Sequence, residues 1–413
     1  MSASSSIVIV GAGHGGVQAA ASLREEGFAG RIALVGDEAE IPYHRPPLSK
    51  AYLKGEVDLG GLALRAEAFF HEHRIDLVFG AKAQHIERIE HSLKLESGVS
   101  LGYDKLILAT GARARELKVP GADFSNVHAL RTVRDAVAIR AELGQGKRVV
   151  IIGAGFIGLE IAATAQKLGG EVTVLEIADR VMGRAVSPTL SAFFADAHRA
   201  FGARLLLATG VAAIHGEGGR ASAVETTSGE RLPADVVVAG VGIVAEDALA
   251  RRAGLDCENG VVVDNTMTTS DPDIYAIGDC AYFPSRQLRS RVRLESVQNA
   301  TDQAKCAAKA ILGRPAPYEA LPWFWSDQGD LKLQIAGLSH GVDAWTTRGD
   351  PASRAFSVFG FKDGALSVVE SVNKGGDHMA ARRIIAAGLP VTPAEAADAG
   401  FDLRKLALGA RGA

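Results

Sequence analysis

Cysteine is scarce in this sequence and is not arranged for redox or metal chemistry. The 413 residues include three cysteines, Cys257, Cys280 and Cys306, and no Cys-x-x-Cys pair. Such sparse cysteines fit a reducing compartment and provide neither a redox dithiol nor a thiolate metal cage. His71 and His73 resemble a pair of metal ligands, but their spacing does not put both rings on one helix face. We therefore expect no metal site.

A large excess of charge and long apolar runs are also missing. The net charge is −3, with 47% hydrophobic and 23% charged residues, so we expect no general affinity for nucleic acid or anionic lipid. The segment 2–6 has no basic residue, and the apolar run that follows it is too short to span a bilayer. We expect a cytoplasmic protein of two or three domains.

Glycine is abundant, at 47 residues, and one pattern built around it occurs twice. Each copy has a β-branched run typical of a buried parallel strand, then Gly-x-Gly-x-x-Gly, a helix, and a second strand that ends near an acid. The predicted strand, helix and strand are 7–10, 17–26 and 31–35 in the first copy, and 149–152, 159–168 and 171–175 in the second.

This pattern is typical of a pyrophosphate site. The first glycine permits a tight turn, the second lets a phosphate approach the backbone, and the third lets the helix pack on the strand. An acid about 20 residues further on binds the adenosine ribose. A plain glycine-rich turn is the alternative, but it would not need the strand, helix and acid. The residues are Gly11, Gly13, Gly16 and Asp37, then Gly153, Gly155, Gly158 and Glu176.

A glutamate at the second ribose position predicts NADH rather than NADPH, because Glu176 would repel a 2′-phosphate. Arg180 could accommodate that phosphate, but we interpret it as a solvated surface residue. Two dinucleotide sites in one chain favour a fixed FAD and an exchangeable nicotinamide, since hydride passes readily between the two rings.

Further apolar strands are predicted at 105–108, 235–239 and 274–277, each stopped by glycine. From about Ala316 the composition changes, with aromatic residues at 323–325 and a run at 355–359 that reads as an antiparallel strand. We predict an α/β fold with two Rossmann-like dinucleotide-binding domains and a C-terminal α+β domain.

Longer motifs at 43–50 (YHRPPLSK), 274–281 (IYAIGDCA), 295–300 (ESVQNA) and 322–328 (PWFWSDQ) resemble one family. It is the FAD-dependent ferredoxin reductases that serve haem-thiolate monooxygenases and ring-hydroxylating dioxygenases. The resemblance covers nearly the whole chain. It implies a glutathione-reductase-type flavoprotein that takes hydride from NADH and passes electrons singly to a [2Fe–2S] ferredoxin.

The resemblance also implies domains and site residues. Residues 1–112 and 245–315 would bind FAD, 113–244 would bind NADH, and 316–413 would form the α+β domain. The FAD residues carried over are Gly11, Gly13, His14, Gly16, Asp37, Arg45, Lys50, Ala83, Arg131, Asp279, Val297 and Trp325. The NADH residues are Gly153, Gly155, Gly158 and Glu176.

Two of these expectations have a physical reason in the sequence. Asp279 follows a buried strand, where it would accept a ribitol hydroxyl or, alternatively, cap a turn. Val297 begins a helix whose N-terminus would stabilise negative charge on reduced flavin, unless that helix simply packs on the surface. The resemblance further implies that Lys50 and Glu160 form a pair where nicotinamide stacks on flavin. The pair would orient the carboxamide and steady charge at the flavin N5 without transferring a proton; the alternative for Glu160 is a favourable acid at a helix start.

Ferredoxins are typically acidic, so we expect a basic docking rim. Arg65 and Lys305 are the preferred residues, although either could be part of a solvated face. Trp323 and Trp325 are candidates for shielding the flavin edge, with ordinary core packing as the alternative.

A disulfide or peroxide reductase of this architecture would need an early cysteine, and none precedes Cys257. Rubredoxin as the acceptor stays open. A signalling flavoprotein like apoptosis-inducing factor would favour a targeting segment and a basic DNA-binding surface. The sequence leaves the oligomeric state undecided.

Overall fold

The computed structural model describes residues 5–409, and they form two compact units. The first unit contains the chain up to His44, residues 59–113 and residues 244–320. The second contains residues 45–58, residues 114–243 and the chain from Leu321 onward. The segment that carries Lys50 is therefore in the same unit as Glu160.

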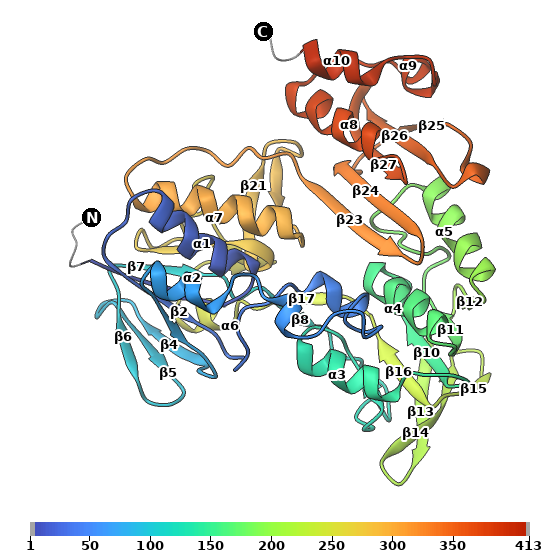
Figure 1. Cartoon of the computed structure of the whole chain (residues 1–413), viewed down its shortest axis with the longest axis horizontal. Helices are drawn as coiled ribbons and strands as arrows, with labels where there is room; N and C mark the ends of the chain where they lie inside the picture. Colours follow the sequence, from blue (N-terminus) through green and yellow to red (C-terminus); the bar gives the residue numbers. More distant parts are fainter. Residues whose placement is uncertain (1–4, 410–413) are drawn as a thin grey trace. The chain divides into compact units, whose positions relative to one another are not determined.

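A five-stranded parallel sheet organises the first unit, with strand order β20-β7-β1-β2-β3. Strands β7 and β2 of this sheet are labelled in Figure 1. The bounds are Ser6–Val10 (β1), Arg31–Val35 (β2), Ile75–Val78 (β3), Lys105–Leu108 (β7) and Ile274–Ala276 (β20). Because parallel strands all point the same way, their carboxyl ends lie along one edge of the sheet.

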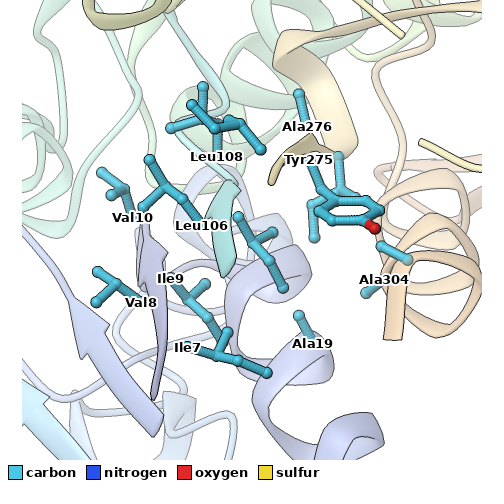
Figure 2. Packing of buried hydrophobic residues seen from close by; sticks show 14 of the residues in the cluster. Ile7, Val8, Ile9, Val10, Ala19, Leu106, Leu108, Tyr275, Ala276 and Ala304 are labelled. Carbon is cyan, nitrogen blue, oxygen red and sulfur yellow. The ribbon is translucent and has the colours of Figure 1, made fainter. Parts of the chain in front are cut away.

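Strand β1 lies in the middle of this sheet and is almost fully buried. Ile7, Val8 and Ile9 have no exposed surface, which explains the uninterrupted β-branched run. Helices α1 (His14–Glu25) and α7 (Val297–Ile311) pack against each other beside it. Figure 2 shows Ala19 of α1 and Ala304 of α7 in the same apolar cluster as β1.

The first unit also contains short helices and two smaller sheets. They are α2 (Glu67–Glu72), β4 (Ala83–Glu87), β5 (Ser92–Leu95), β6 (Ser100–Gly102), α6 (Ala248–Arg252), β18 (Cys257–Glu258), β19 (Gly260–Val262), β21 (Ala281–Ser285) and β22 (Ser290–Val292).

The second unit repeats the parallel arrangement, with strand order β12-β11-β10-β16-β9. The strands are β9 (Val127–His128), β10 (Arg148–Ile152), β11 (Glu171–Leu175), β12 (Arg204–Leu206) and β16 (Val236–Ala239). They accompany α3 (Val133–Glu142), α4 (Phe156–Lys167), α5 (Pro188–Ala200) and the antiparallel strands β13 (Val211–Glu217), β14 (Arg220–Thr226) and β15 (Arg231–Pro233).

The C-terminal part of the second unit is a five-stranded antiparallel sheet of order β23-β24-β27-β26-β25, with three helices. The strands are β23 (Trp323–Gln328), β24 (Leu331–Gly337), β25 (Ala344–Arg348), β26 (Phe356–Lys362) and β27 (Ala365–Val372). The helices are α8 (Gly375–Ala387), α9 (Pro393–Ala397) and α10 (Leu403–Gly409).

Two parallel sheets with helices and one antiparallel C-terminal sheet confirm the predicted fold class. The predicted helix starts were wrong: α1 and α4 begin at His14 and Phe156, three residues before Val17 and Leu159. The third glycine of each motif lies inside the helix, where the missing side chain permits close packing. Within residues 5–409, no helix combines the length and apolar character needed to cross a bilayer.

Glu370 is a fully buried carboxyl on β27. It accepts hydrogen bonds from the backbone N–H of Ser187, at 2.8 Å, and from its hydroxyl, at 2.5 Å, where α5 begins. Burial raises the pKa of Glu370 from its ordinary value of 4.5 to about 7, against the opposing effect of these hydrogen bonds. At a pH between these two values, the folded protein therefore keeps a proton on Glu370 that the unfolded chain releases.

Glu370→Gln should make stability less dependent on pH. Between pH 4.5 and 7 the folded protein binds more protons at Glu370 than the unfolded chain, so the wild-type free energy of unfolding falls as pH rises. A neutral glutamine avoids this loss. The free energy of unfolding of the variant should therefore exceed that of wild type by about 1–3 kcal/mol at pH 8 and should equal it near pH 4.5.

Denaturant unfolding of both proteins across this pH range measures the difference. The same exchange at the exposed Glu72 is the control. A stability difference between the two proteins that does not change with pH would contradict the raised pKa of Glu370.

Candidate functional site

The first glycine motif makes the turn from β1 into α1. Gly11 has φ +111°, and a Cβ there would lie 2.1 Å from the carbonyl oxygen of Ala109. A Cβ on Gly16 would lie 1.8 Å from the carbonyl oxygen of Gly11. Protein packing therefore requires glycine at both positions.

Gly13 is different, because nothing in the protein requires its lack of a side chain. Its φ is −83°, which any residue can adopt, and a Cβ there would meet no protein atom within 4 Å. The second motif repeats the contrast. Gly153 has φ +103° and Gly158 faces the Gly153 carbonyl at 2.1 Å, whereas Gly155 has φ −78° and open space. A phosphate group fits both open positions.

The helix starts at these motifs also lack side-chain caps. Gly13 and Gly155 are the N-cap residues of α1 and α4, and no side chain accepts from the first-turn N–H groups as a cap. By contrast, Thr132, Ser187 and Ser296 cap α3, α5 and α7. Uncapped N–H groups beside open space suit an anion.

Asp279 and Val297 come near the first glycine motif. Asp279 lies in a short 3₁₀ helix (Gly278–Cys280) that follows β20, and Val297 begins α7. The N–H of Gly278 donates to Oε1 of Gln303 on α7, at 2.7 Å. A Cβ on Gly15 of α1 would lie 3.7 Å from Cβ of Ala300 on α7. The glycine motif, the segment of Asp279 and the start of α7 therefore meet at one edge of the parallel sheet.

The other sequence-predicted residues of the first unit lie around this edge or on nearby strands. Nε2 of His14 lies 3.3 Å from Nδ1 of His44. Asp37 is exposed just after β2, and the half-buried Ala83 begins β4. Their proposed contacts with a dinucleotide stay predictions.

Arg65 and Lys305, the predicted docking residues, are both exposed. The Arg65 guanidinium lies 5.5 Å from the ring centre of Phe69, and its charge adds to the solvent exclusion that lowers the pKa of His44. Lys305 lies 3.2 Å from the carboxylate of Asp302, which offsets part of its charge.

Glu176 is the acid of the second motif. Its carboxylate accepts from the backbone N–H of Ala154, at 2.7 Å, and from that of Ala178, at 2.9 Å. The first bond fixes the acid against the glycine turn. The interpretation of Arg180 as a solvated surface residue was wrong, because its half-buried guanidinium donates to the carbonyls of Gly183 and Val186.

Arg45 and Arg131 are half-buried neighbours in the second unit. Nη1 of Arg45 donates to the Arg131 carbonyl at 2.8 Å, and the N–H of Arg131 donates to Asp135 at 2.9 Å. The two predicted cofactor residues are therefore held by one local network at the start of α3.

Glu160 is a buried carboxylate on α4, with 5% of its surface exposed. Its Oε2 lies 2.6 Å from Nζ of Lys50 and 2.5 Å from Oγ of Ser49. Its Oε1 accepts from Oγ of Ser326, on β23, at 2.6 Å. The alternative interpretation as an acid at the helix start was wrong, since Glu160 lies beyond the first turn of α4.

Sequence reasoning missed the residues that support this carboxylate. Ser326 and Gln328 are fully buried on β23, and Gln328 contacts the fully buried His198 of α5. The available signal was a pair of polar residues two apart, which share one face of a strand. The contact of Glu160 with Ser49 links residues 111 positions apart, and no local pattern shows it.

Trp323 and Trp325 are half-buried on β23, with ring centres 5.7 Å apart. The guanidinium of Arg382 lies 4.6 Å from the ring centre of Trp323. Shielding of a flavin edge by Trp325 stays a prediction. Among the described residues, no group of three or more His, Cys, Asp or Glu side chains could hold a metal ion.

Comparison with protein families gives two matches. Residues 5–304 match the pyridine nucleotide-disulphide oxidoreductase family, and residues 323–407 match the reductase C-terminal family. Rhodocoxin reductase of Rhodococcus erythropolis is 50% identical over 399 residues, which cover 97% of this chain and 93% of the relative.

Two solved structures are similar over nearly the whole chain. The ferredoxin reductase for the CYP199A2 system from Rhodopseudomonas palustris has a TM-score of 0.95 and 48% identity, with 97% of this chain and 99% of that one covered. The reductase of the covalent putidaredoxin reductase–putidaredoxin complex has a TM-score of 0.96 and 40% identity, with both chains fully covered.

Gly13→Ala and Gly155→Ala should each fold and lose one ligand. Neither Cβ meets a protein atom, so any defect reports on what fills the open space. Gly13→Ala should be purified with little bound dinucleotide. Gly155→Ala should keep it and bind NADH at least about tenfold more weakly, a loss of about 1.4 kcal/mol.

The dinucleotide released on denaturation and an NADH titration measure the two effects. Gly102→Ala and Gly144→Ala are matched controls, because their Cβ atoms also meet nothing within 4 Å. Normal binding of both ligands by both test variants would show that the glycine motifs are not part of the ligand sites.

Proposed function

The chain belongs to the pyridine nucleotide-disulphide oxidoreductase family and to its ferredoxin reductases, and from this premise we propose that it is an NADH-dependent, FAD-containing reductase of a [2Fe–2S] ferredoxin. The ferredoxin would serve a monooxygenase or dioxygenase. The observation that carries the proposal is the pair of glycine turns whose second glycine faces open space, one in each compact unit.

Reduction of a disulfide substrate fits the chain poorly. Burial raises the pKa of the Cys257 and Cys306 thiols to about 11, and it also raises the pKa of the fully buried Cys280 thiol. A thiol in its protonated form is a weak nucleophile. Bound flavin accepts hydride and releases electrons singly, which suits a one-electron iron–sulfur acceptor.

We assign the cofactors to the two motifs in chain order. Residues 1–112 and 245–315 would bind FAD, with Gly13 and the start of α1 at the pyrophosphate and Asp279 at the ribitol. Residues 113–244 would bind NADH, with Gly155 and the start of α4 at its pyrophosphate. Residues 316–413 would form the C-terminal α+β domain.

Glu176 supports NADH over NADPH. Two backbone N–H groups hold its carboxylate, and each oxygen can accept a further bond from a ribose hydroxyl. A 2′-phosphate would meet a fixed negative charge. Arg180 already donates to two backbone carbonyls, so its guanidinium is committed to the turn it stabilises.

The Lys50–Glu160 pair is the proposed contact for the nicotinamide. Glu160 lies two residues beyond Gly158, on the helix whose start would bind the pyrophosphate. An ion pair held at 2.6 Å offers an ammonium donor and a carboxylate acceptor to a carboxamide group. Its role would be orientation, since hydride transfer depends on distance and alignment.

The central test combines a spectrum with two acceptor assays. Purified protein should show bound flavin that NADH bleaches without oxygen, and it should reduce cytochrome c faster when a [2Fe–2S] ferredoxin is added. Stimulation by rubredoxin instead would replace the acceptor in the proposal. Colourless protein that FAD cannot reconstitute would rule the proposal out. Cytoplasmic location stays a prediction from the sparse cysteines.

Lys305→Glu should weaken ferredoxin reduction. Reversing a rim charge against an acidic partner should raise the KM for ferredoxin by roughly three- to tenfold, with kcat nearly unchanged. The KM for NADH and the reduction of ferricyanide should not change. Lys405→Glu, at an exposed lysine of the other unit, is the charge-matched control. An unchanged KM for ferredoxin would remove Lys305 from the docking surface.

A further inference from the structure

A continuous chain of hydrogen bonds leads away from Glu160 through the second unit. Oγ of Ser326 donates to Glu160 at 2.6 Å, and Nε2 of Gln328 lies 3.2 Å from Oγ of Ser326. Oε1 of Gln328 lies 2.8 Å from Nε2 of His198. Glu160 is 5% exposed and the other three residues are fully buried. These bonds are therefore shielded from bulk solvent.

The direction of every bond in this chain follows from the carboxylate. An ionised carboxylate only accepts, so the single proton of the Ser326 hydroxyl points at Glu160. Ser326 must then accept from the Gln328 amide, whose second N–H faces Sδ of Met182 at 3.6 Å. The Gln328 carbonyl is left as an acceptor, so His198 must donate from Nε2.

His198 fits this direction as a neutral ring. Burial lowers its pKa, and Nδ1 has no hydrogen-bond partner among the described residues. Protonation at Nδ1 would place a charge and an unmet donor in the interior. The ring is therefore expected to carry one proton, on Nε2, and to donate it to Gln328.

We propose that Ser326 and Gln328 are positioning residues that hold the Glu160 carboxylate in place beside Lys50. The inference rests on the proposed function, because it gives residues 316–413 a part in the nicotinamide site. Strand β23, which carries Ser326 and Gln328, packs on α4, where the ring centres of Phe156 and Phe324 are 4.6 Å apart. Oε2 has two donors from residues 49 and 50, and Oε1 has the donor from β23.

The kinetic test separates orientation from binding. Ser326→Ala should lower the limiting rate of flavin reduction by NADH about tenfold, since a hydrogen bond to a buried charged group contributes roughly that factor. The Kd for NAD⁺, read from the flavin spectrum without turnover, should change less than about twofold. Ser326→Thr keeps the hydroxyl and should recover most of the rate.

Ser371→Ala is the matched control. Ser371 is a fully buried serine of the same sheet whose hydroxyl bonds to Ser357 at 3.1 Å. It should leave the rate and the Kd near wild type. Equal rates in Ser326→Ala and Ser371→Ala would overturn the proposal.

A double variant tests whether Ser326 acts through Glu160. In a Glu160→Gln background, Ser326→Ala should have little further effect, because the carboxylate that it serves is gone. A full additional tenfold loss would mean that Ser326 acts by another route, and the proposal would fail. Wild-type protein that NADH does not bleach would instead sink the proposed function itself.

The imidazole of His198 gives a readout independent of turnover and of the variants' stability. In ¹⁵N-histidine-labelled holoenzyme at neutral pH, His198 should show the neutral form with the proton on Nε2. Gln328→Met should shift its resonances, while Ser371→Ala should not. A neutral ring with its proton on Nδ1 instead of Nε2 would reverse the deduced direction and overturn the proposal.

Discussion

Close contact between a helix and the turn before it is the constraint on which both proposed cofactor sites depend. Gly16 and Gly158 bring α1 and α4 so near the preceding turns that a Cβ would lie 1.8 or 2.1 Å from a carbonyl oxygen. This packing brings each helix start to the edge of its parallel sheet. The uncapped N–H groups and the second glycine then face open space, where a pyrophosphate fits.

A second constraint arises because the second unit buries an acid on the helix of its glycine motif. Glu160 needs donors that α4 does not supply, and it receives them from Ser49, Lys50 and Ser326. The bonds to Ser49 and Ser326 join residues 111 and 166 positions apart. Placing one carboxylate therefore ties the helix of the second motif to an early segment and to the C-terminal sheet.

These two constraints explain which features the sequence could predict. The glycine turns, the strands beside them and the acid at Glu176 depend on neighbours within one βαβ unit, so their pattern is visible locally. The predicted helix starts came after the third glycine of each motif, whereas Gly16 and Gly158 lie inside the helices. The support from Ser326, Gln328 and His198 could not be predicted, since it exists only after distant segments pack.

One difference between the two copies of the motif agrees with the proposal that the first holds a cofactor and the second positions a reacting ring. The residue two places after the third glycine is Gln18 in the first copy and Glu160 in the second. Gln18 donates to Ser22 of its own helix at 3.0 Å, so it places no demand on the rest of the fold.

Glu160 carries a charge that must be matched by distant donors. Hydride transfer depends on distance and alignment. A carboxylate whose two oxygens are held by separate segments would keep a fixed position for this alignment. Under the proposed function the C-terminal sheet would belong to the site through Ser326, because removing its hydroxyl would leave Oε1 of the buried Glu160 without the donor that the structure gives it.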